Sequence, residues 1–442
     1  MSFGNVPRDF SVSSLSVLRS TAAKSINGLF SADIRTVGAL LQSERSPDVW
    51  VTAPVVTVPA TQLGNKITVP TATSNVGIQG SVSANADGSV FGITYRAPAS
   101  LAAILKNNFG SLTQTPLSIP GDAIGPIIGQ TNIAISYIGD LALFVSPNDN
   151  GNIGAVWPYV EGPTDTWTIG AKIVPSNNIG ACILNPISIS EDASLFVVGG
   201  TGDNAENGAA WVFARTGASW TQQAKLTAPA TALNESFFGS AVAISADGST
   251  IVCGSPDING FVKRGGAYIF VKVGSNWLQQ GGVLFSTFPS PQSFQGGSVS
   301  ISGDGNIMTL GAYNDPNLVG SLTVFNRSGT GNNPWTQGQT LVPRNVVASP
   351  PDGAGVGTGV ISKDGQCIAV SGIANNGDQG AIWIFTQGPP GVWTQNGPGF
   401  TGSGAVGSAN QGTALSISAN GKILIEGGPQ DDTGIGALWI FV

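Results

Sequence analysis

The stretch FGSAVAISADGSTIVCGSPDINGFVKRGGAYIFVKVGSNWLQQGGVL, at residues 238–284, contains four short segments that are each typical of a β-strand. GSAVAIS, from Gly239, alternates small or polar residues with apolar ones, and the turn at Asp247-Gly248 ends it. TIVCGSP, GAYIFVKV (from Gly266) and WLQQGGVLF (from Trp277) follow as further strands. We therefore predict one four-stranded antiparallel sheet from this stretch.

The same pattern recurs along the chain, and a turn after the first strand of each copy marks it. The turns follow one another at intervals of 52 to 60 residues, at Asp87-Gly88, Gly139-Asp140, Asp192-Ala193, Asp247-Gly248, Asp304-Gly305, Asp364-Gly365 and Asn420-Gly421. One such sheet cannot bury both of its apolar faces alone, so neighbouring copies must supply the missing contacts. The spacing predicts an all-β fold, a seven-bladed β-propeller of four-stranded antiparallel blades.

The third and fourth strands of the copies carry nine of the ten tryptophans. The third recurs as GAVWPYV, GAAWVFA, GAYIFVK, GSLTVFN, GAIWIFT and GALWIFV, and the fourth contains Trp167, Trp220, Trp277, Trp335 and Trp393. We interpret these tryptophan side chains as structural, each packed against a neighbouring sheet or capping a strand edge.

The last copy ends at Val442, directly after its third strand. An open terminal sheet would leave unpaired edges in the ring. NKITVPT, at residues 65–71, resembles the ends of other fourth strands, such as AKLTAPA at 224–230 and AKIVPSN at 171–177. We predict that residues 61–70 complete the seventh sheet, and that the propeller domain spans residues 60–442.

Residues 1–59 do not match the repeat. Apolar positions between residues 12 and 41 fit a helical spacing in part, although Gly28 and many serines weaken it. This segment is either a docking or assembly arm that packs on a neighbouring molecule, or an extension folded back over its own domain.

With these residues in hand, the chain resembles the FG-GAP-like repeat proteins, whose copies form seven-bladed propellers as in integrin alpha heads. The resemblance covers about residues 61–442, and Phe238-Gly239 followed by Gly254-Ser255-Pro256 is its closest match. The first copy, with LAAILKNNFG at 101–110, departs most from the pattern.

Many blades of that family carry an acidic calcium loop between the first and second strands. Here that place holds turns such as SADGST, and one carboxylate cannot supply the six to eight oxygens that calcium prefers.

The loops between the second and third strands are richer in acidic residues. Asp203, Glu206, Asp431 and Asp432 could bind a cation weakly. We favour the interpretation that they are turn residues whose side chains accept hydrogen bonds from their own backbone. No cofactor, metal or catalytic residue is therefore predicted.

Charged residues make up only 10% of the 442, against about a quarter in an average soluble domain. Such a surface has little charge repulsion, so it either favours dense self-association or simply tolerates crowding. The net charge of −7 and the absence of a basic stripe argue against nucleic acid as a partner. The N-terminus has neither the basic nor the apolar region of a secretion signal, and no eighteen-residue apolar run predicts a membrane span.

Two residue types bear directly on chemistry. The chain has no histidine, which removes the usual general base and metal ligand, and we predict that the protein is not an enzyme. Its three cysteines, Cys182, Cys253 and Cys367, lie in separate apolar strands and are expected to be buried hydrophobes.

Two functions remain. The first is a non-enzymatic structural protein that self-assembles through its propeller and N-terminal arm into a shell, fibre or matrix, such as a virion component. The alternative is an adhesion propeller that binds a glycan or protein ligand through one ring face. The first predicts copies of the same chain as partner in a virion or other extracellular assembly, and an intracellular place is also open.

Overall fold

The computed structural model describes residues 58–70, 72–74, 76–78, 81–97, 100–108, 111–124, 131–229, 236–257, 265–287, 293–313, 319–329, 333–347 and 354–442. The chain divides into two compact units, Met1–Val56 and Thr57–Val442. The predicted helical spacing of residues 12–41 lies outside the described residues.

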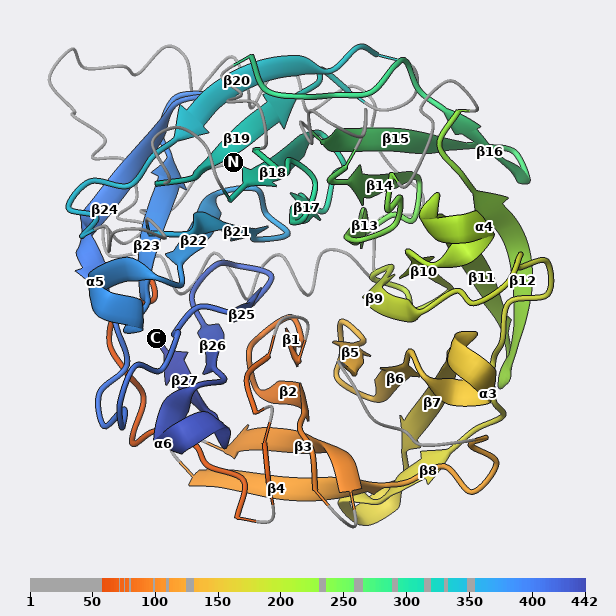
Figure 1. The fold of residues 1–442 in the computed structure, drawn as a ribbon, viewed down its shortest axis with the longest axis horizontal. Helices are drawn as coiled ribbons and strands as arrows, with labels where there is room; N and C mark the ends of the chain where they lie inside the picture. The colour runs from red at the N-terminus through yellow and green to blue at the C-terminus, as the bar shows by residue number, and fades with distance from the viewer. Residues whose placement is uncertain are drawn as a thin grey trace, which may run out of the picture. The chain divides into compact units, whose positions relative to one another are not determined.

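The second unit is a ring of seven sheets (Figure 1). Six sheets have four antiparallel strands in chain order, and the seventh has three. Blades 1 to 3 are β1 (Val82–Ala84), β2 (Val90–Thr94), β3 (Ser100–Asn108) and β4 (Ser111–Ser118); β5 (Asn132–Ile135), β6 (Leu141–Ser146), β7 (Ala155–Glu161) and β8 (Trp167–Ile169); and β9 (Leu184–Ile189), β10 (Leu195–Gly200), β11 (Ala209–Thr216) and β12 (Ser219–Leu226).

Blades 4 to 7 continue the order. They are β13 (Val242–Ile244), β14 (Thr250–Ser255), β15 (Gly266–Val273) and β16 (Asn276–Gln279); β17 (Val299–Ile301), β18 (Ile307–Ala312), β19 (Ser321–Asn326) and β20 (Thr336–Leu341); β21 (Val356–Ile361), β22 (Cys367–Gly372), β23 (Ala381–Gln387) and β24 (Trp393–Phe400); and β25 (Ala414–Ile417), β26 (Leu424–Gly428) and β27 (Ala437–Phe441). The predicted seven-bladed propeller is confirmed.

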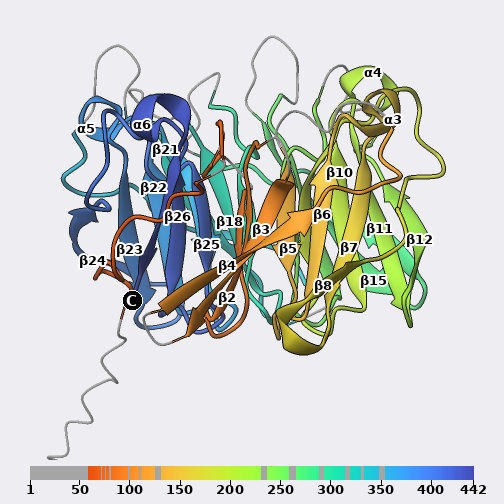
Figure 2. The same ribbon diagram turned by 90° about the horizontal axis from the view of Figure 1, so that it is seen from below.

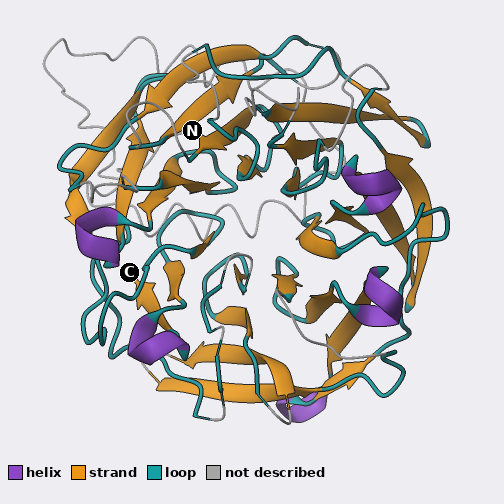
Figure 3. Ribbon diagram, viewed as in Figure 1, coloured by secondary structure: helices purple, strands orange, loops and turns teal. Residues whose placement is uncertain are grey.

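Strand dominates this unit (Figure 3). The described helical segments are single turns: α3 (Asp149–Asn152), η1 (Pro163–Asp165), α4 (Asp203–Glu206), α5 (Asn375–Asp378) and α6 (Asp431–Gly434). Seen from the side, α3 to α6 lie on one face of the ring (Figure 2). Because successive strands are antiparallel, the turns between first and second strands lie at the opposite end of each blade.

Blade 4 follows the predicted segments closely, with one difference. The expected fourth strand ran from Trp277 to Phe285, whereas β16 ends at Gln279. Gly281 and Gly282 follow, and glycine weakens a strand interior. The chain then returns to the sheet at Leu284, which forms an isolated bridge with Ala267.

The ring is closed by the segment before the first blade, as predicted. The Ile67 amide donates to the Leu438 carbonyl at 2.8 Å, and the Leu438 amide returns a bond to Ile67 at 3.0 Å. Farther along, the Leu63 amide donates to the Ile440 carbonyl at 2.7 Å. The N-terminal segment therefore pairs with β27 and takes the place of the fourth strand of blade 7.

Apolar residues fill the spaces between blades. Trp157, Trp211, Trp383 and Trp439 are among the largest fully buried side chains. The three cysteines are free and buried, as expected, and burial raises the pKa of the Cys182 thiol to about 12. These groups belong to the core, where van der Waals contact and the hydrophobic effect hold adjacent sheets together.

Serines on the innermost strands add polar links between blades. In blades 1, 3, 5 and 7 a serine hydroxyl accepts a hydrogen bond from an innermost-strand amide of the next blade; the pairs are Ser83 with Ile135, Ser188 with Ile244, Ser300 with Ile361 and Ser416 with Ala84. The innermost strands are thus held edge to edge around the centre of the ring.

Candidate functional site

A cavity of about 880 Å³ opens at the end of the ring formed by the turns between first and second strands. Turns from blades 2 to 7 line it, through Tyr137, Ile138, Glu191, Asp192, Ala246, Asp247, Gly303, Lys363, Asp364, Ala419 and Asn420. We call this cavity the channel mouth. A second cavity of about 510 Å³ lies along the innermost strands and has no charged residue in its lining.

In blades 3 to 6 a serine and an aspartate build the turn at this end, and in blade 7 Ser418 and Asn420 do so. In blade 4 the Ser245 hydroxyl donates to Asp247 Oδ1 at 2.6 Å, and the Thr250 amide donates to the same hydroxyl. Burial acts to raise the pKa of Asp247, but hydrogen bonds from Ser245 and Ser249 outweigh it, and the pKa is lowered. The aspartate is therefore a turn element with its Oδ1 already used by hydrogen bonds within the turn.

Backbone hydrogen bonds link these turns around the channel mouth. The amide of one turn donates to a carbonyl of the next, as from Glu191 to Ala246 at 2.9 Å and from Ala246 to Gly303 at 2.9 Å. Gly303 then donates to Lys363 at 2.8 Å, and a Cβ at Gly303 would lie 2.7 Å from that carbonyl oxygen. Only glycine allows this close approach.

The turns of one pair of neighbouring blades are not joined by such a backbone hydrogen bond, and we call this place the open junction. Bonds of this kind join every pair of neighbouring blades except blades 2 and 3. There, among the described residues, the Tyr137 amide and the Glu191 carbonyl have no hydrogen-bond partner. The sequence also departs from the pattern, because Ile138 stands where blade 4 has Asp247, and Ile138 is 73% exposed. Asp140, which the sequence pattern paired with the other turn aspartates, lies two residues later in its turn and accepts from Ser136.

Lys363 is the one basic residue in the lining of the channel mouth. Burial lowers the pKa of its ammonium, and the Glu191 carboxylate acts against that shift. The lining otherwise carries Glu191 and three aspartates, so the channel mouth has a surplus of negative charge and of hydrogen-bond acceptors.

The opposite face uses its acids differently. In α3 to α6, two consecutive residues have left-handed backbone; Asn204 and Ala205, for example, have φ of 52° and 54°. L-residues disfavour this conformation, and Asn or Asp tolerates it best. Asn stands first of the two in α3, α4 and α5, and Asp in α6, which explains why these sequences form the turn.

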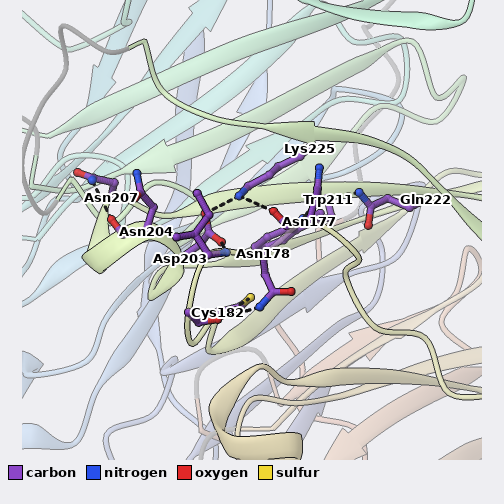
Figure 4. Close-up of polar contacts among 11 residues, drawn as sticks. Asn177, Asn178, Cys182, Asp203, Asn204, Asn207, Trp211, Gln222 and Lys225 are labelled. Atoms are coloured by element: carbon purple, nitrogen blue, oxygen red, sulfur yellow. Dashed lines mark hydrogen bonds and ion pairs between the residues drawn. The ribbon is translucent and has the colours of Figure 1, made fainter.

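In blade 3 this turn fixes a buried ion pair (Figure 4). Asp203 is 1% exposed; its Oδ1 accepts the Ile179 amide at 2.6 Å, and its Oδ2 lies 2.7 Å from Lys225 Nζ. The Asn204 amide donates back to the Ile179 carbonyl at 2.8 Å. Lys225 also lies over the Trp211 ring, 5.4 Å from its centroid. We call this arrangement the clamp, because it ties the segment before the blade to its second, third and fourth strands.

The clamp recurs in blades 2 and 7. Asp149 pairs with Lys172 at 2.5 Å, and Asp431 pairs with Lys66 at 2.7 Å. Their Oδ1 atoms accept the Ile124 and Val406 amides at 2.7 Å and 2.6 Å.

Blade 6 has a neutral version of the clamp. Asn375 takes the place of the aspartate and accepts the Val347 amide at 2.7 Å. The strand pairing puts Gly399 where blade 3 has Lys225, since Phe400 pairs with Ile382 as Leu226 pairs with Ala210. A Cβ there would lie 2.5 Å from Trp383 Nε1. In blade 6 the aspartate of the clamp is thus replaced by Asn375 and its lysine by Gly399.

The four candidate cation ligands do not come together. Asp203 and Asp431 are buried in separate clamps, where they bind a lysine and the preceding segment. The prediction that they bind their own backbone was wrong for these two. Glu206 and Asp432 are exposed beside them. Sequence reasoning missed the lysines, although AKIV, AKLT and NKIT each contain one at the same place.

Glu426 is a further buried acid, on β26. It is fully buried opposite Trp439, at the position that Val198 and Val370 hold in blades 3 and 6. Burial raises the pKa of its carboxyl well above the usual value, against the weaker effect of the Gly412 and Gly402 amides. Its position thus differs from that of Asp149, Asp203 and Asp431, each of which lies beside a lysine.

Neither a metal-binding cluster nor a membrane-spanning helix occurs among the described residues. They contain no group of three or more Cys, Asp or Glu side chains placed to hold a metal ion. Nor do they include a helix with the length and apolar character needed to cross a membrane.

Comparison with known proteins agrees with this architecture. The model of the FG-GAP repeat matches residues 220–270, which run from β12 to β15. The chain is a seven-bladed propeller in which this segment matches the FG-GAP repeat. The match covers the stretch that best fits the resemblance, whereas no curated protein matches the chain.

Among solved structures, the periplasmic gluconolactonase of Pseudomonas aeruginosa aligns with a TM-score of 0.51 and 15% identity, over 76% of this chain and 87% of that one. A chain of a mitotic checkpoint complex gives 0.53 and 12%, over 90% and 96%. Hydrazine synthase of Kuenenia stuttgartiensis gives 0.51 and 12%, over 85% and 98%. At these identities the likeness is one of fold.

Proposed function

We propose that this propeller is a non-enzymatic structural protein that self-assembles into a shell, fibre or matrix, of which a virion shell is one form. The observation that carries the proposal is the chemistry of its rim. The outermost strands β4, β8, β12, β16, β20 and β24 contain one charged residue, Lys225, and that residue is held in a clamp.

An outermost strand presents unpaired backbone amides and carbonyls on its free edge. Soluble proteins commonly protect such edges with charged residues, especially lysine, because another chain can otherwise pair with them. These six strands lie at the outside of the ring (Figure 1), and Thr and Gln are their commonest residues, followed by Leu and Trp. β12, from Ser219 to Leu226, is eight residues long and contains no proline. It is therefore the edge best suited to pair with another copy, and residues 1–59 remain the predicted connector.

The absence of histidine and the use of buried acids in clamps support a non-enzymatic role. The P. aeruginosa protein is described as a gluconolactonase, but at 15% identity it shares a fold with this chain, and fold alone does not carry an activity.

Sedimentation velocity of the full chain over a hundredfold range of concentration tests the proposal. We expect oligomers that grow with concentration. Gln223→Lys puts a charge on the β12 edge and should weaken association, whereas Gln366→Lys, at an exposed turn outside the rim, should not. A full-length protein that stays monomeric throughout would exclude self-assembly.

The channel mouth favours a second function, binding of a small polar ligand as an adhesion propeller does. Its volume lies within the usual range of ligand sites, and it holds a backbone donor, a backbone acceptor, an ammonium and four carboxylates. The two functions are compatible, because the channel mouth and the rim are different surfaces.

A further inference from the structure

The open junction between blades 2 and 3 leaves a matched pair of backbone groups at the channel mouth. Elsewhere around the ring the amide of one turn donates directly to the carbonyl of the next. Here the Tyr137 amide can donate and the Glu191 carbonyl can accept, and both residues line the cavity. A secondary amide has one acceptor and one donor, which point in opposite directions in its usual trans form, so it can bridge a donor and an acceptor at one junction.

The rest of the lining accepts more hydrogen bonds than it donates. Asp192, Asp247 and Asp364 each use Oδ1 within their own turn, through Ser190, Ser245 and Ser362. Among the described residues none of their Oδ2 atoms accepts a hydrogen bond. These oxygens and the Glu191 carboxylate are acceptors for hydroxyl groups, and the Lys363 ammonium, which also lines the cavity, is a donor. Tyr137 and Ile138 supply an aromatic and an aliphatic surface.

We infer that the channel mouth binds an N-acetylated amino sugar, the terminal N-acetylhexosamine of a glycan. The acetamido carbonyl accepts from the Tyr137 amide, and the acetamido N–H donates to the Glu191 carbonyl. Sugar hydroxyls donate to the free carboxylate oxygens and accept from Lys363, and the apolar face of the sugar lies against Tyr137 and Ile138. The inference rests on the second proposed function and names its ligand class.

A peptide also contains secondary amides, but the lining favours the sugar. A peptide backbone has no hydroxyl groups to donate to the carboxylates. An N-acetylhexosamine brings several hydroxyls beside its single amide, which matches one open junction surrounded by acceptors.

Titration of the full chain with N-acetylglucosamine, with glucose as the matched control, tests the inference by calorimetry or saturation-transfer NMR. Glucose carries a hydroxyl in place of the acetamido group and is otherwise identical. Without the two hydrogen bonds of the acetamido group, glucose should bind at least about tenfold more weakly. Equal binding of both sugars would overturn the inference and leave ligand binding in place.

A double variant tests whether the preference for N-acetylglucosamine over glucose depends on the open junction. Ile138→Asp with Asp140→Ser changes the turn of blade 2 to Ser-Tyr-Asp-Gly-Ser, the pattern of Ser-Ala-Asp-Gly-Ser in blade 4. We expect it to remove the preference for N-acetylglucosamine. Glu191→Gln leaves the backbone carbonyl in place, so it should weaken both sugars and keep their ratio. Near-ultraviolet circular dichroism verifies that each variant is folded.

Triglycine completes the test as the peptide probe. Binding of triglycine without binding of N-acetylglucosamine would replace the sugar by a peptide and would overturn the inference while keeping the second function. Binding of none of the three probes would overturn the inference and also count against that function.

Discussion

The two ends of blade 3 use the same residue type in opposite ways. Asp203 is buried in α4, and both of its oxygens are held, by the Ile179 amide and by Lys225. Asp192 is exposed in the turn at the channel mouth, where Oδ1 accepts from Ser190 and Ser194, and within the part of the chain that the structure describes Oδ2 accepts no hydrogen bond. A carboxylate taken out of water must be paired, whereas one left in water can serve a ligand.

The difference teaches where stability and function separate in this ring. Acids on the clamp face hold blades 2, 3 and 7 to their preceding segments, and acids at the channel mouth shape a turn and leave one oxygen available. Substitutions that remove the partner of a buried acid, or that add an acid where no partner stands, should therefore affect stability more than changes at the channel mouth.

The largest effect is expected where a clamp loses its base. Lys225→Met keeps the aliphatic stem over Trp211 but leaves the Asp203 carboxylate buried without a counter-charge. Breaking a buried pair in this way costs about 3–5 kcal/mol. The double variant Asp203→Asn with Lys225→Met imitates the neutral clamp of blade 6 and should recover more than half of that loss. Urea unfolding gives all four free energies of the cycle, and additive losses would contradict the clamp.

The reverse change in blade 6 should be smaller but still destabilising. Asn375→Asp puts a carboxylate into a buried site where Gly399 stands in place of a lysine. We expect a loss of roughly 1–3 kcal/mol in the free energy of unfolding at pH 7. The loss should shrink at pH 4.5, where the introduced acid takes up a proton. Unfolding curves at both pH values measure it, and a loss independent of pH would mean that charge is not its cause.

Glu426 is neither a clamp acid nor a channel-mouth acid, because it is buried and forms no ion pair among the described residues. Its pKa is raised in the folded state, so the folded protein binds the proton more tightly than the unfolded chain. The stability that this group contributes is therefore present below about pH 4.3, the usual glutamate pKa, and is lost as pH rises toward the folded value. Glu426→Gln should remove this part of the pH dependence, and Glu426→Val should stabilise the protein at pH 7 by roughly 1–2 kcal/mol. Identical pH dependence of wild type and Glu426→Gln would contradict this account.

The smallest effect on stability is expected at the channel mouth. Ile138→Asp with Asp140→Ser can close the open junction with one backbone hydrogen bond, which contributes about 1 kcal/mol at most. Thermal unfolding should therefore place it close to wild type, although its ligand preference changes. A large loss of stability would show that the open junction is needed by the fold.

The seven-bladed ring could be predicted from the sequence because the patterns that produce it are local and repeat along the chain. Alternating strands, turn residues such as Asp247-Gly248 and the missing fourth strand are all visible in one dimension, and even the closure by residues 61–70 followed from them. The clamps were missed because Asp203 and Lys225 meet only after three strands have paired. The open junction depends on a hydrogen bond between neighbouring blades, which no spacing within blade 2 encodes, although Ile138 at an aspartate position was its visible sign.

Neutralising each aspartate of blade 3 in turn tests the central claim most directly. Asp203→Asn and Asp192→Asn make the same chemical change at the two ends of one blade. Equilibrium urea unfolding at pH 7 should show a loss of about 3 kcal/mol for Asp203→Asn and less than about 1 kcal/mol for Asp192→Asn. Equal losses, or a larger loss for Asp192→Asn, would contradict the division between clamp and channel mouth.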